Sequence, residues 1–310
     1  MYDQEVLAEL ERAAGNPAVA GANIGSLTSL GCGGAAALLI EAESSERLAQ
    51  ILHIAAAHEV DWFVFGLGSN LLVADSGWDG MVIRLAGDLK QCIPAQDGRL
   101  TCGGGATLPK AASVAAAAGL SGLEALAGIP GTIGGAVAMN AGAWGTDIGS
   151  LTERITLCLP GETREIGRDF LKFSYRHCEL PPGAVISRVV LALSLGETES
   201  IKAEMTRYRE QRTENQPVGE RTCGSVFRNP PEGMSAGELL ERAGCKGLQH
   251  RGASISTRHA NFIVNQGGVS ADVIWLMNEC RRLVYEKFGV VLEPEVMLLG
   301  DIELKDPVLR

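Results

Sequence analysis

The segment GLSGLEALAGIPGTIGGAVAMNAGAWG, residues 119–145, decides how this chain is interpreted. Six glycines fall within residues 128–145, on either side of an apolar stretch. An ordinary connection between two elements does not need so many positions without a side chain. Because glycine lets the backbone approach a ligand closely, we expect this loop to bind an extended ligand rather than to serve only as a bend.

A shorter glycine-rich loop lies earlier in the chain, at Gly66–Leu71, directly after the apolar residues 62–65. A strand that leads into a loop without Cβ atoms lets consecutive N–H groups converge on phosphate oxygens. Leu71 stands where the GxGxxG motif requires its third glycine, and no Gly-Lys-Ser/Thr sequence of a Walker loop is present. By itself this loop is as compatible with an ordinary turn as with a ligand site; the longer loop makes the ligand site the better interpretation.

The composition limits the class of protein. The 310 residues are 46% hydrophobic with a net charge of −10 and a pI near 5.1, which indicates two or three folded domains and argues against nucleic acid or an anionic membrane as partner. No apolar run is long enough to span a membrane and no signal peptide is recognisable, so we expect a cytoplasmic protein. The eight cysteines include no CxxC pair, so we expect reduced, mostly buried thiols and no metal site.

Alternating strand and helix patterns run along the chain, and a polar stretch at 196–200 marks a domain boundary. We expect a helix capped by Ser44 or Ser45, and strands at 38–41, 62–65, 71–73, 81–85, 101–105, 154–159, 184–193, 261–264 and around 290–299. Further helices are expected at 108–118, 201–215, 236–243 and 271–288.

Six segments, in order along the chain, give these patterns a specific meaning. The two glycine loops, extended to residues 66–83 and 119–145, are followed by FSYRHC (173–178), GSVFRNP (224–230), HANFIVN (259–265) and LEPEV (292–296). Together they resemble the UDP-N-acetylenolpyruvoylglucosamine reductase family, from about Thr28 to Gly300. Arg176 and Ser225 are 49 positions apart, a short spacing that resembles the form of that family without an extra substrate-covering loop.

The resemblance implies an α+β fold of the vanillyl-alcohol-oxidase/PCMH type. Two α+β subdomains that bind FAD would span residues 1–86 and 87–197, followed by an α+β substrate-binding domain at 198–310, whose last residues would return to the FAD domain. It implies FAD as cofactor and NADPH as co-substrate, no nucleic-acid or membrane partner, and a monomer. The cofactor-binding residues would be Gly66, Gly68, Ser69, Asn70, Leu71, Ile129, Pro130, Gly131, Thr132, Gly134, Gly135, Asn140, Ala141 and Gly142.

The implied reaction reduces the enolpyruvyl ether of UDP-N-acetylglucosamine to UDP-N-acetylmuramate. Arg176 matches the catalytic arginine, whose fork suits a carboxylate on which negative charge develops. Ser225 matches the proton donor to the enolate carbon, and Glu295 the catalytic carboxylate. An ionised carboxylate beside an enolate would be unfavourable, so we expect a raised pKa for Glu295; a titration showing it fully ionised in the substrate complex would contradict this.

The substrate's UDP group would be bound by Arg228 and Asn229, with Tyr175 lining the same cleft. Taken without the motifs, Arg176 is a surface ion pair, Ser225 a turn residue, Glu295 an exposed edge residue and Tyr175 a packing residue. His259 is interpreted as a hydrogen-bonded structural histidine. The chain departs from the family where Cys178 replaces a serine and where Arg221–Gly224 replaces PSAG, which affects fine contacts rather than the fold.

Three alternatives stay open at this point. One is a flavin oxidoreductase of the same fold with another substrate, and one is a nucleotide-sugar-binding or regulatory protein without activity. Arg176, Ser225 and Glu295 in matching motifs argue against both. An NAD-only dehydrogenase is disfavoured by Leu71.

Overall fold

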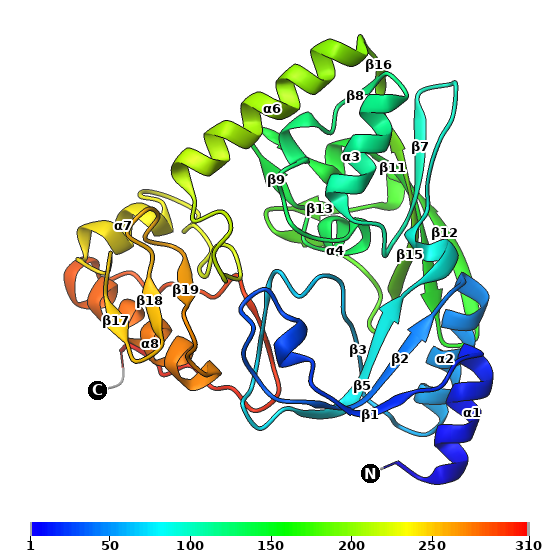
Figure 1. The fold of residues 1–310 in the computed structure, drawn as a ribbon, viewed down its shortest axis with the longest axis horizontal. Coiled ribbons are helices and arrows are strands. Elements are labelled where there is room, and N and C mark those ends of the chain that lie inside the picture. Colours follow the sequence, from blue (N-terminus) through cyan, green and yellow to red (C-terminus); the bar gives the residue numbers. More distant parts are fainter. Residues whose placement is uncertain (1, 309–310) are drawn as a thin grey trace. The chain divides into compact units, whose positions relative to one another are not determined.

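The computed structural model describes residues 2–308 (Figure 1). The α-helices of this part of the chain are α1 (Gln4–Ala14), α2 (Ser45–Ala57), α3 (Leu108–Ala117), α4 (Ile133–Ala138), α5 (Ile148–Leu151), α6 (Thr198–Asn215), α7 (Ala236–Arg242) and α8 (Ser270–Phe288). Contacts divide the chain into two compact units. The first comprises Met1–Ala20, Ala37–Leu67 and Gly80–Gln211, and the second Gly21–Ala36, Gly68–Asp79 and Arg212–Arg310.

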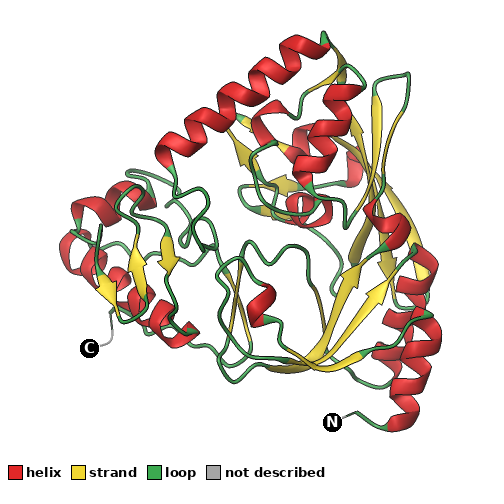
Figure 2. Ribbon diagram, in the orientation of Figure 1, coloured by secondary structure: helices red, strands yellow, loops and turns green. Residues whose placement is uncertain are grey.

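A four-stranded sheet lies mostly in the first unit. Its order is β1–β2–β5–β3, formed by β1 (Val19–Ala22), β2 (Ala36–Ala42), β5 (Trp78–Leu85) and β3 (Trp62–Val64), and β3 runs parallel to β5. Helix α2 begins after Ser44, whose hydroxyl accepts a hydrogen bond from the amide of Arg47 at 3.3 Å, as the sequence predicted. Helices α1 and α2 pack side by side, and their buried residues share one core with β2 and β5 (Figure 2).

A five-stranded antiparallel sheet forms the rest of the first unit. Its order is β12–β11–β15–β7–β6, formed by β12 (Glu162–Gly167), β11 (Thr152–Leu159), β15 (Val185–Ala192), β7 (Arg99–Gly103) and β6 (Cys92–Pro94). Helices α3 and α4 cover it and complete a second core. Short two-stranded pairs decorate this sheet: β9 (Gly142–Ala143) with β10 (Thr146–Asp147), β13 (Phe173–Ser174) with β14 (His177–Cys178), and β8 (Leu120–Ser121) with β16 (Ser194–Leu195).

The second unit has its own core around helix α8. A three-stranded sheet, β17 (Gln249–His250), β18 (Ala253–Ile255) and β19 (Ile263–Asn265), packs on that helix. Strand β20 (Met297–Leu299) pairs in parallel with β4 (Leu71–Val73), so the last strand joins a segment from the first 86 residues. The core includes Leu30 and Leu72 from these early segments.

Most expected elements are confirmed, and one difference is informative. Strands were expected around 290–299, and the ladder covers 297–299. Residues 292–296 instead make isolated contacts such as the bridge from Phe227 to Pro294. Pro294 has no N–H group and cannot extend a regular ladder there. The three-domain boundaries at 86/87 and 197/198 stay a prediction.

None of the helices within residues 2–308 is long and apolar enough to cross a membrane.

Candidate cofactor and active site

The two glycine-rich loops meet within the first unit at Gly66 and Thr132. A Cβ atom added to Gly66 would lie 2.9 Å from Oγ1 of Thr132, closer than carbon and oxygen normally approach. The early loop therefore needs a glycine at this position because the second loop is packed against it. Sequence reasoning assigned both loops to one ligand, and this contact brings Gly66 and Thr132 together as that assignment requires.

Backbone hydrogen bonds fix the second loop against the preceding strand. The amide of Leu108 donates to Gly131 O at 2.9 Å, and the amide of Gly134 donates to Gly104 O at 2.8 Å. A Cβ on Gly134 would lie 3.0 Å from that same carbonyl oxygen. Packing within the protein thus explains why Gly134 is a glycine, without any ligand. Only the other glycines of this loop can indicate that a ligand approaches the backbone closely.

Several amides of these loops remain without a protein acceptor. Within residues 2–308, no hydrogen bond is formed by the N–H groups of Gly66, Leu67, Gly131 and Thr132. N–H groups of partly exposed residues that have no acceptor in the protein can donate hydrogen bonds to phosphate oxygens. Successive backbone N–H groups in a turn form a concave site for an anion. The first unit therefore fits the diphosphate of FAD at the loops where the sequence predicted it.

Asn140 has a role that the sequence did not reveal. This residue is 9% exposed and has a positive φ of 39°. Its Oδ1 accepts a hydrogen bond from the amide of Gly149 at 3.0 Å, and its Nδ2 donates to Ser174 O at 3.1 Å. The side chain predicted to bind the cofactor therefore joins the end of the second loop to the β13–β14 hairpin.

The β13–β14 hairpin carries Tyr175 and Arg176 as its two turn residues, because Ser174 pairs with His177. Arg176 has a φ of 56°, in the left-handed region that favours glycine. Its guanidinium carbon lies 5.0 Å from the centre of the Tyr175 ring, and that tyrosine is 52% exposed. The predicted catalytic arginine and the predicted substrate-lining tyrosine therefore project from one strained turn of the first unit.

The second unit brings Ser225 and Glu295 together. Ser225 forms a β-bridge with Phe262, and the amide of Glu295 donates to Val226 O at 2.8 Å. The residues following Ser225 thus run between the 259–265 and 292–296 segments. Three of the sequence motifs converge here, and two of the three predicted catalytic residues are adjacent in space.

Asn261 holds this arrangement and was absent from the predicted site residues. Its Oδ1 accepts from the amide of Phe227 at 2.9 Å and its Nδ2 donates to Phe227 O at 2.8 Å. A side-chain amide here replaces a neighbouring strand, which leaves no backbone group of the buried Phe227 unpaired. The only indication of this role in the sequence was a polar asparagine within the otherwise apolar segment of HANFIVN.

The end of the early glycine loop belongs to the second unit and supports Glu295. Nδ2 of Asn70 donates to Glu295 O at 3.1 Å, and the amide of Met297 donates to Asn70 O at 3.1 Å. Gly68 O accepts hydrogen bonds from both the amide and the hydroxyl of Ser29 at 3.1 and 3.2 Å. Asn70, predicted to bind FAD, thus also holds the backbone of the predicted catalytic residue Glu295.

Arg228 and Asn229 continue the segment after Ser225. Arg228 is exposed, its amide donates to Glu293 O at 2.9 Å, and its guanidinium has no partner within residues 2–308. Asn229 Oδ1 accepts from the amide of Ala236 at 2.9 Å at the start of helix α7. Arg228 is therefore available to an anion, while Asn229 has a structural contact in addition to any ligand.

The two family departures that involve cysteine are buried. Cys178 is 3% exposed and lies opposite Phe173 in the hairpin, and burial raises the pKa of its thiol. Cys223 is 1% exposed, and burial raises the pKa of its thiol to about 12, with a smaller contribution from the charge of Glu295. Both cysteines act as uncharged packing groups beside predicted catalytic residues.

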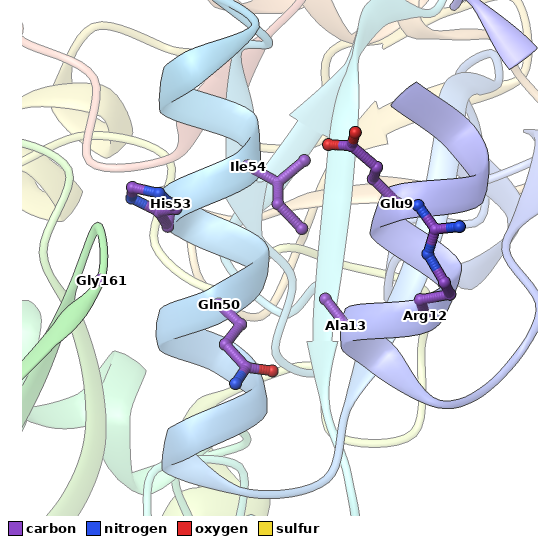
Figure 3. A pocket seen from close by; sticks show the side chains of 7 residues that line it. All are labelled: Glu9, Arg12, Ala13, Gln50, His53, Ile54 and Gly161. Carbon is purple, nitrogen blue, oxygen red and sulfur yellow. The ribbon is translucent and has the colours of Figure 1, made fainter. Parts of the chain in front are cut away.

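A surface pocket of about 390 Å³ lies elsewhere on the first unit. It is formed by α1, α2 and the turn at Gly161, and Figure 3 shows the side chains that line it. Glu9 of this pocket pairs with His58 at 3.3 Å. It contains none of the predicted site residues. Among residues 2–308, no group of three His, Cys, Asp or Glu side chains is arranged to hold a metal ion.

Comparisons with known proteins agree with the two-part organisation. A family model described as an FAD binding domain matches residues 36–157, and one described as the C-terminal domain of UDP-N-acetylenolpyruvoylglucosamine reductase matches residues 216–299. The UDP-N-acetylenolpyruvoylglucosamine reductase of Myxococcus xanthus (strain DK1622) is 40% identical over 298 residues, 95% of this chain and 96% of that protein. That of Anaeromyxobacter sp. (strain Fw109-5) is 40% identical over 306 residues, covering 98% and 95%.

A solved structure is similar in fold as well as in sequence. The crystal structure of UDP-N-acetylenolpyruvylglucosamine reductase (MurB) from Thermus caldophilus gives a TM-score of 0.78 at 38% identity, covering 91% of this chain and 98% of that chain. These matches first define a class: the protein is an FAD-dependent oxidoreductase with the α+β, vanillyl-alcohol-oxidase-type fold that the sequence predicted. The near full-length identities then give the family. This chain belongs to the UDP-N-acetylenolpyruvoylglucosamine reductase family.

Proposed function

We propose that this protein reduces the enolpyruvyl ether of UDP-N-acetylglucosamine to UDP-N-acetylmuramate, a step of peptidoglycan precursor synthesis, with NADPH as the electron donor. The observation that carries the proposal is 40% identity over 95% of the chain to a reductase named for this substrate. The adjacency of Ser225 and Glu295, through the bond from Glu295 N to Val226 O, supports it. We further propose that the protein acts as a cytoplasmic monomer.

FAD would be held by the two glycine loops. The unpaired amides of Gly66, Leu67, Gly131 and Thr132 would donate to its phosphate oxygens. The other loop residues predicted from the sequence would complete the site. When bound, FAD supplies hydride transfer, from NADPH to the flavin and from the flavin to the vinyl carbon of the substrate.

Arg176 and Glu295 would act on the charge that develops next to the reacting carbon. The guanidinium of Arg176 would form a paired hydrogen bond with the substrate carboxylate and stabilise the enolate. Glu295, held by Asn70 and by Val226, would carry a proton or share one at this stage. A protonated carboxyl group donates a hydrogen bond to the enolate, whereas an ionised one would repel it.

Ser225 would supply the proton that completes the reaction. Its hydroxyl would donate a proton to the carbon atom of the enolate. A serine hydroxyl is a weak acid, but this carbon is a stronger base than the serine alkoxide that the transfer leaves behind. The β-bridge to Phe262 fixes the backbone of Ser225, so the place from which its hydroxyl acts is set before substrate binds. The exposed guanidinium of Arg228 would bind the diphosphate of the UDP group, together with the neighbouring Asn229. Tyr175 stays a predicted substrate-binding residue.

The visible absorption spectrum of the purified protein tests the proposal. Flavin bands should be present, bleach on anaerobic addition of NADPH, and return when the enolpyruvyl substrate is added. A protein that is colourless and cannot be reconstituted with FAD would contradict the assignment of the loops. A flavin that NADPH reduces but this substrate does not reoxidise would assign the fold to another electron acceptor.

A further inference from the structure

Two cysteines face each other across the edge of the five-stranded sheet. Cys92 on β6 is the cross-strand partner of Cys102 on β7. The amide of Gly103 donates to Gln91 O at 2.8 Å, so the two cysteines occupy a position between ladder hydrogen bonds. At such positions the Cα atoms of an antiparallel pair are about 4.5 Å apart, which lies within the range that a disulfide spans.

The two thiols differ in exposure and in acidity. Cys102 is fully buried at 0% exposure, whereas Cys92 is partly exposed. A hydrogen bond from the Cys102 thiol lowers the pKa of Cys92 against the opposing effect of burial, and the charge of Lys110 lowers it further. The same hydrogen bond and burial raise the pKa of Cys102. Lys110 is fixed nearby, since its Nζ donates to Lys90 O at 2.8 Å.

We propose that Cys92 and Cys102 are a redox modification site that hydrogen peroxide converts to a reversible disulfide. The Cys92 thiolate attacks one peroxide oxygen, the O–O bond breaks, and Cys92 becomes a sulfenic acid as the first water leaves. The sulfur of Cys102 then displaces the hydroxyl group, which leaves as a second water with the Cys102 proton. Two thiols lose two electrons, one peroxide becomes two waters, and a dithiol reductant reverses the change.

The disulfide would act on the strand that holds the second glycine loop. Strand β7 continues into Gly103 and Gly104, and Gly104 O accepts the hydrogen bond from the amide of Gly134. A Cβ on Gly103 would lie 2.2 Å from Leu89 O, so this stretch is packed closely against the backbone at Leu89. A bond between β6 and β7 would restrain the hairpin in the unfolded chain, and the oxidised protein should melt at a higher temperature.

The chain contains an internal control for this chemistry. The thiols of Cys245 and Cys280 likewise shift each other's pKa, but both are fully buried at 0% exposure. Peroxide has no access to that second pair while the protein is folded. The Cys92–Cys102 and Cys245–Cys280 pairs therefore share the interaction between their thiols. They differ in that one thiol of the first pair, Cys92, is partly exposed.

Exposure of the holoprotein to hydrogen peroxide tests the proposal. After quenching and denaturation, the free-thiol count should fall from eight to six, a peptide joining Cys92 to Cys102 should appear, and dithiothreitol should restore eight. The melting temperature should rise on oxidation and return on reduction. The Cys92→Ser variant should lose no pair of thiols, whereas Cys245→Ser should still lose two.

Three results would overturn the proposal: an unchanged thiol count, a crosslink between Cys245 and Cys280 instead, or Cys92 oxidised without a bond to Cys102. Peptide mapping of the unmodified chain separates these outcomes even if a variant fails to fold. The readouts do not depend on catalysis, so a different substrate for the enzyme would leave the result interpretable.

Discussion

At the scale of single residues, Arg176 combines an unfavourable backbone with a proposed catalytic charge. Its φ of 56° costs an L-residue about 1–3 kcal/mol relative to an ordinary conformation. We predict that Arg176→Gly leaves the melting temperature unchanged or raises it, because glycine adopts this conformation freely. The same variant should lose at least about 100-fold in kcat, since a cation that meets developing charge is removed.

Turnover and thermal melting measured on the same preparations check this prediction. Arg176→Lys is the matched control, because it keeps the strain and a positive charge but loses the planar fork. Arg176→Gly that melts well below the parent protein would show that the side chain stabilises the hairpin. Retained turnover in that variant would remove Arg176 from the proposed mechanism.

Asn140 is the residue for which sequence and structure give different roles. The motif predicted cofactor binding, while its side chain bonds the amide of Gly149 and the carbonyl of Ser174. We predict that Asn140→Ala lowers stability by about 1–3 kcal/mol, because the buried N–H of Gly149 and the partly buried carbonyl of Ser174 lose their partner. We further expect kcat to fall while the Kd for FAD stays within a few-fold, since the hairpin with Arg176 loses its support.

Flavin fluorescence titration and steady-state kinetics distinguish the two roles of Asn140. A Kd for FAD raised by an order of magnitude or more, with kcat normal at saturating FAD, would restore direct cofactor binding as its function. Asn140→Asp is the comparison, because it keeps the acceptor for Gly149 and replaces the donor to Ser174 with a carboxylate oxygen.

At the scale of elements, regular helices and buried strands followed from local pattern. The cap at Ser44 and the apolar strand at 71–73 were both predicted, since capping chemistry and alternation depend on neighbours in sequence. Asn261 was missed because its function is to bond Phe227, which lies 34 positions away. A side chain that takes the place of a neighbouring strand leaves no periodic pattern in the sequence. Residues with this role, such as Asn261, can therefore be recognised only in the folded structure.

The second glycine loop yields a prediction about packing. Gly134→Ala places a Cβ 3.0 Å from Gly104 O and 3.2 Å from Ile186 O, both backbone atoms with little freedom to move. We expect a loss of about 1–3 kcal/mol in stability and a raised Kd for FAD, because the amides of Gly131 and Thr132 shift with the loop. Gly167→Ala is the control, since nothing lies within 4 Å of its added Cβ and its φ is −81°.

Melting curves and FAD titrations of the two glycine variants check this expectation. Equal behaviour of Gly134→Ala and Gly167→Ala in both assays would mean that the loop accommodates a methyl group. The packing explanation of Gly134 would then be wrong, and close approach of a ligand would have to account for that glycine.

The 259–265 segment yields a prediction about pH. Burial first, and then the charge of Lys246, lower the pKa of His259 from 6.5, and its Nδ1 accepts the amide hydrogen of Asn261 at 3.2 Å. The unfolded chain therefore binds a proton at a pH where the folded chain does not. Stability from this group is complete above about pH 6.5 and is lost as the pH falls toward the folded pKa.

Melting temperatures from pH 7.5 to 5 measure this loss. His259→Gln should show a shallower decline than the parent protein over this range, although its stability at pH 7.5 will differ. His53→Gln, at an exposed position on α2, should decline as steeply as the parent. Parallel curves for the parent and His259→Gln would remove His259 as the source of the pH dependence.

At the scale of the whole molecule, the fold class and family could be predicted from the six ordered segments, while the three-domain boundaries stay a prediction. The composition change at 196–200 predicted that a C-terminal domain begins at 198. Contacts group 21–36 and 68–79 with the C-terminal residues from Arg212 onward, a grouping that the sequence did not indicate. These early segments have no compositional mark, because their partners lie about 200 positions later in the chain.

This division predicts that residues 212–310 do not fold by themselves. That fragment lacks β4, the partner of β20, and it lacks the buried side chains of Leu30 and Leu72 in the core. It also lacks Asp75, whose carboxylate accepts the amides of Ser270 and Ala271 at 2.9 Å where α8 begins. Losing two buried leucines costs about 2–5 kcal/mol each and losing a helix cap about 1 kcal/mol, which together reach the range of about 5–15 kcal/mol that stabilises a whole domain.

Amide NMR spectra and circular dichroism of the isolated fragment, compared with the full chain, measure this outcome. We expect poor dispersion and no cooperative melting for the fragment alone. Cooperative unfolding of 212–310 would contradict the argument and would show that the early segments dock onto an already folded domain. We also expect the fragment to gain structure when a peptide of residues 68–79 is added, because that peptide supplies strand β4 and Asp75. Folding of the second unit would then require contacts between segments about 200 positions apart in the chain.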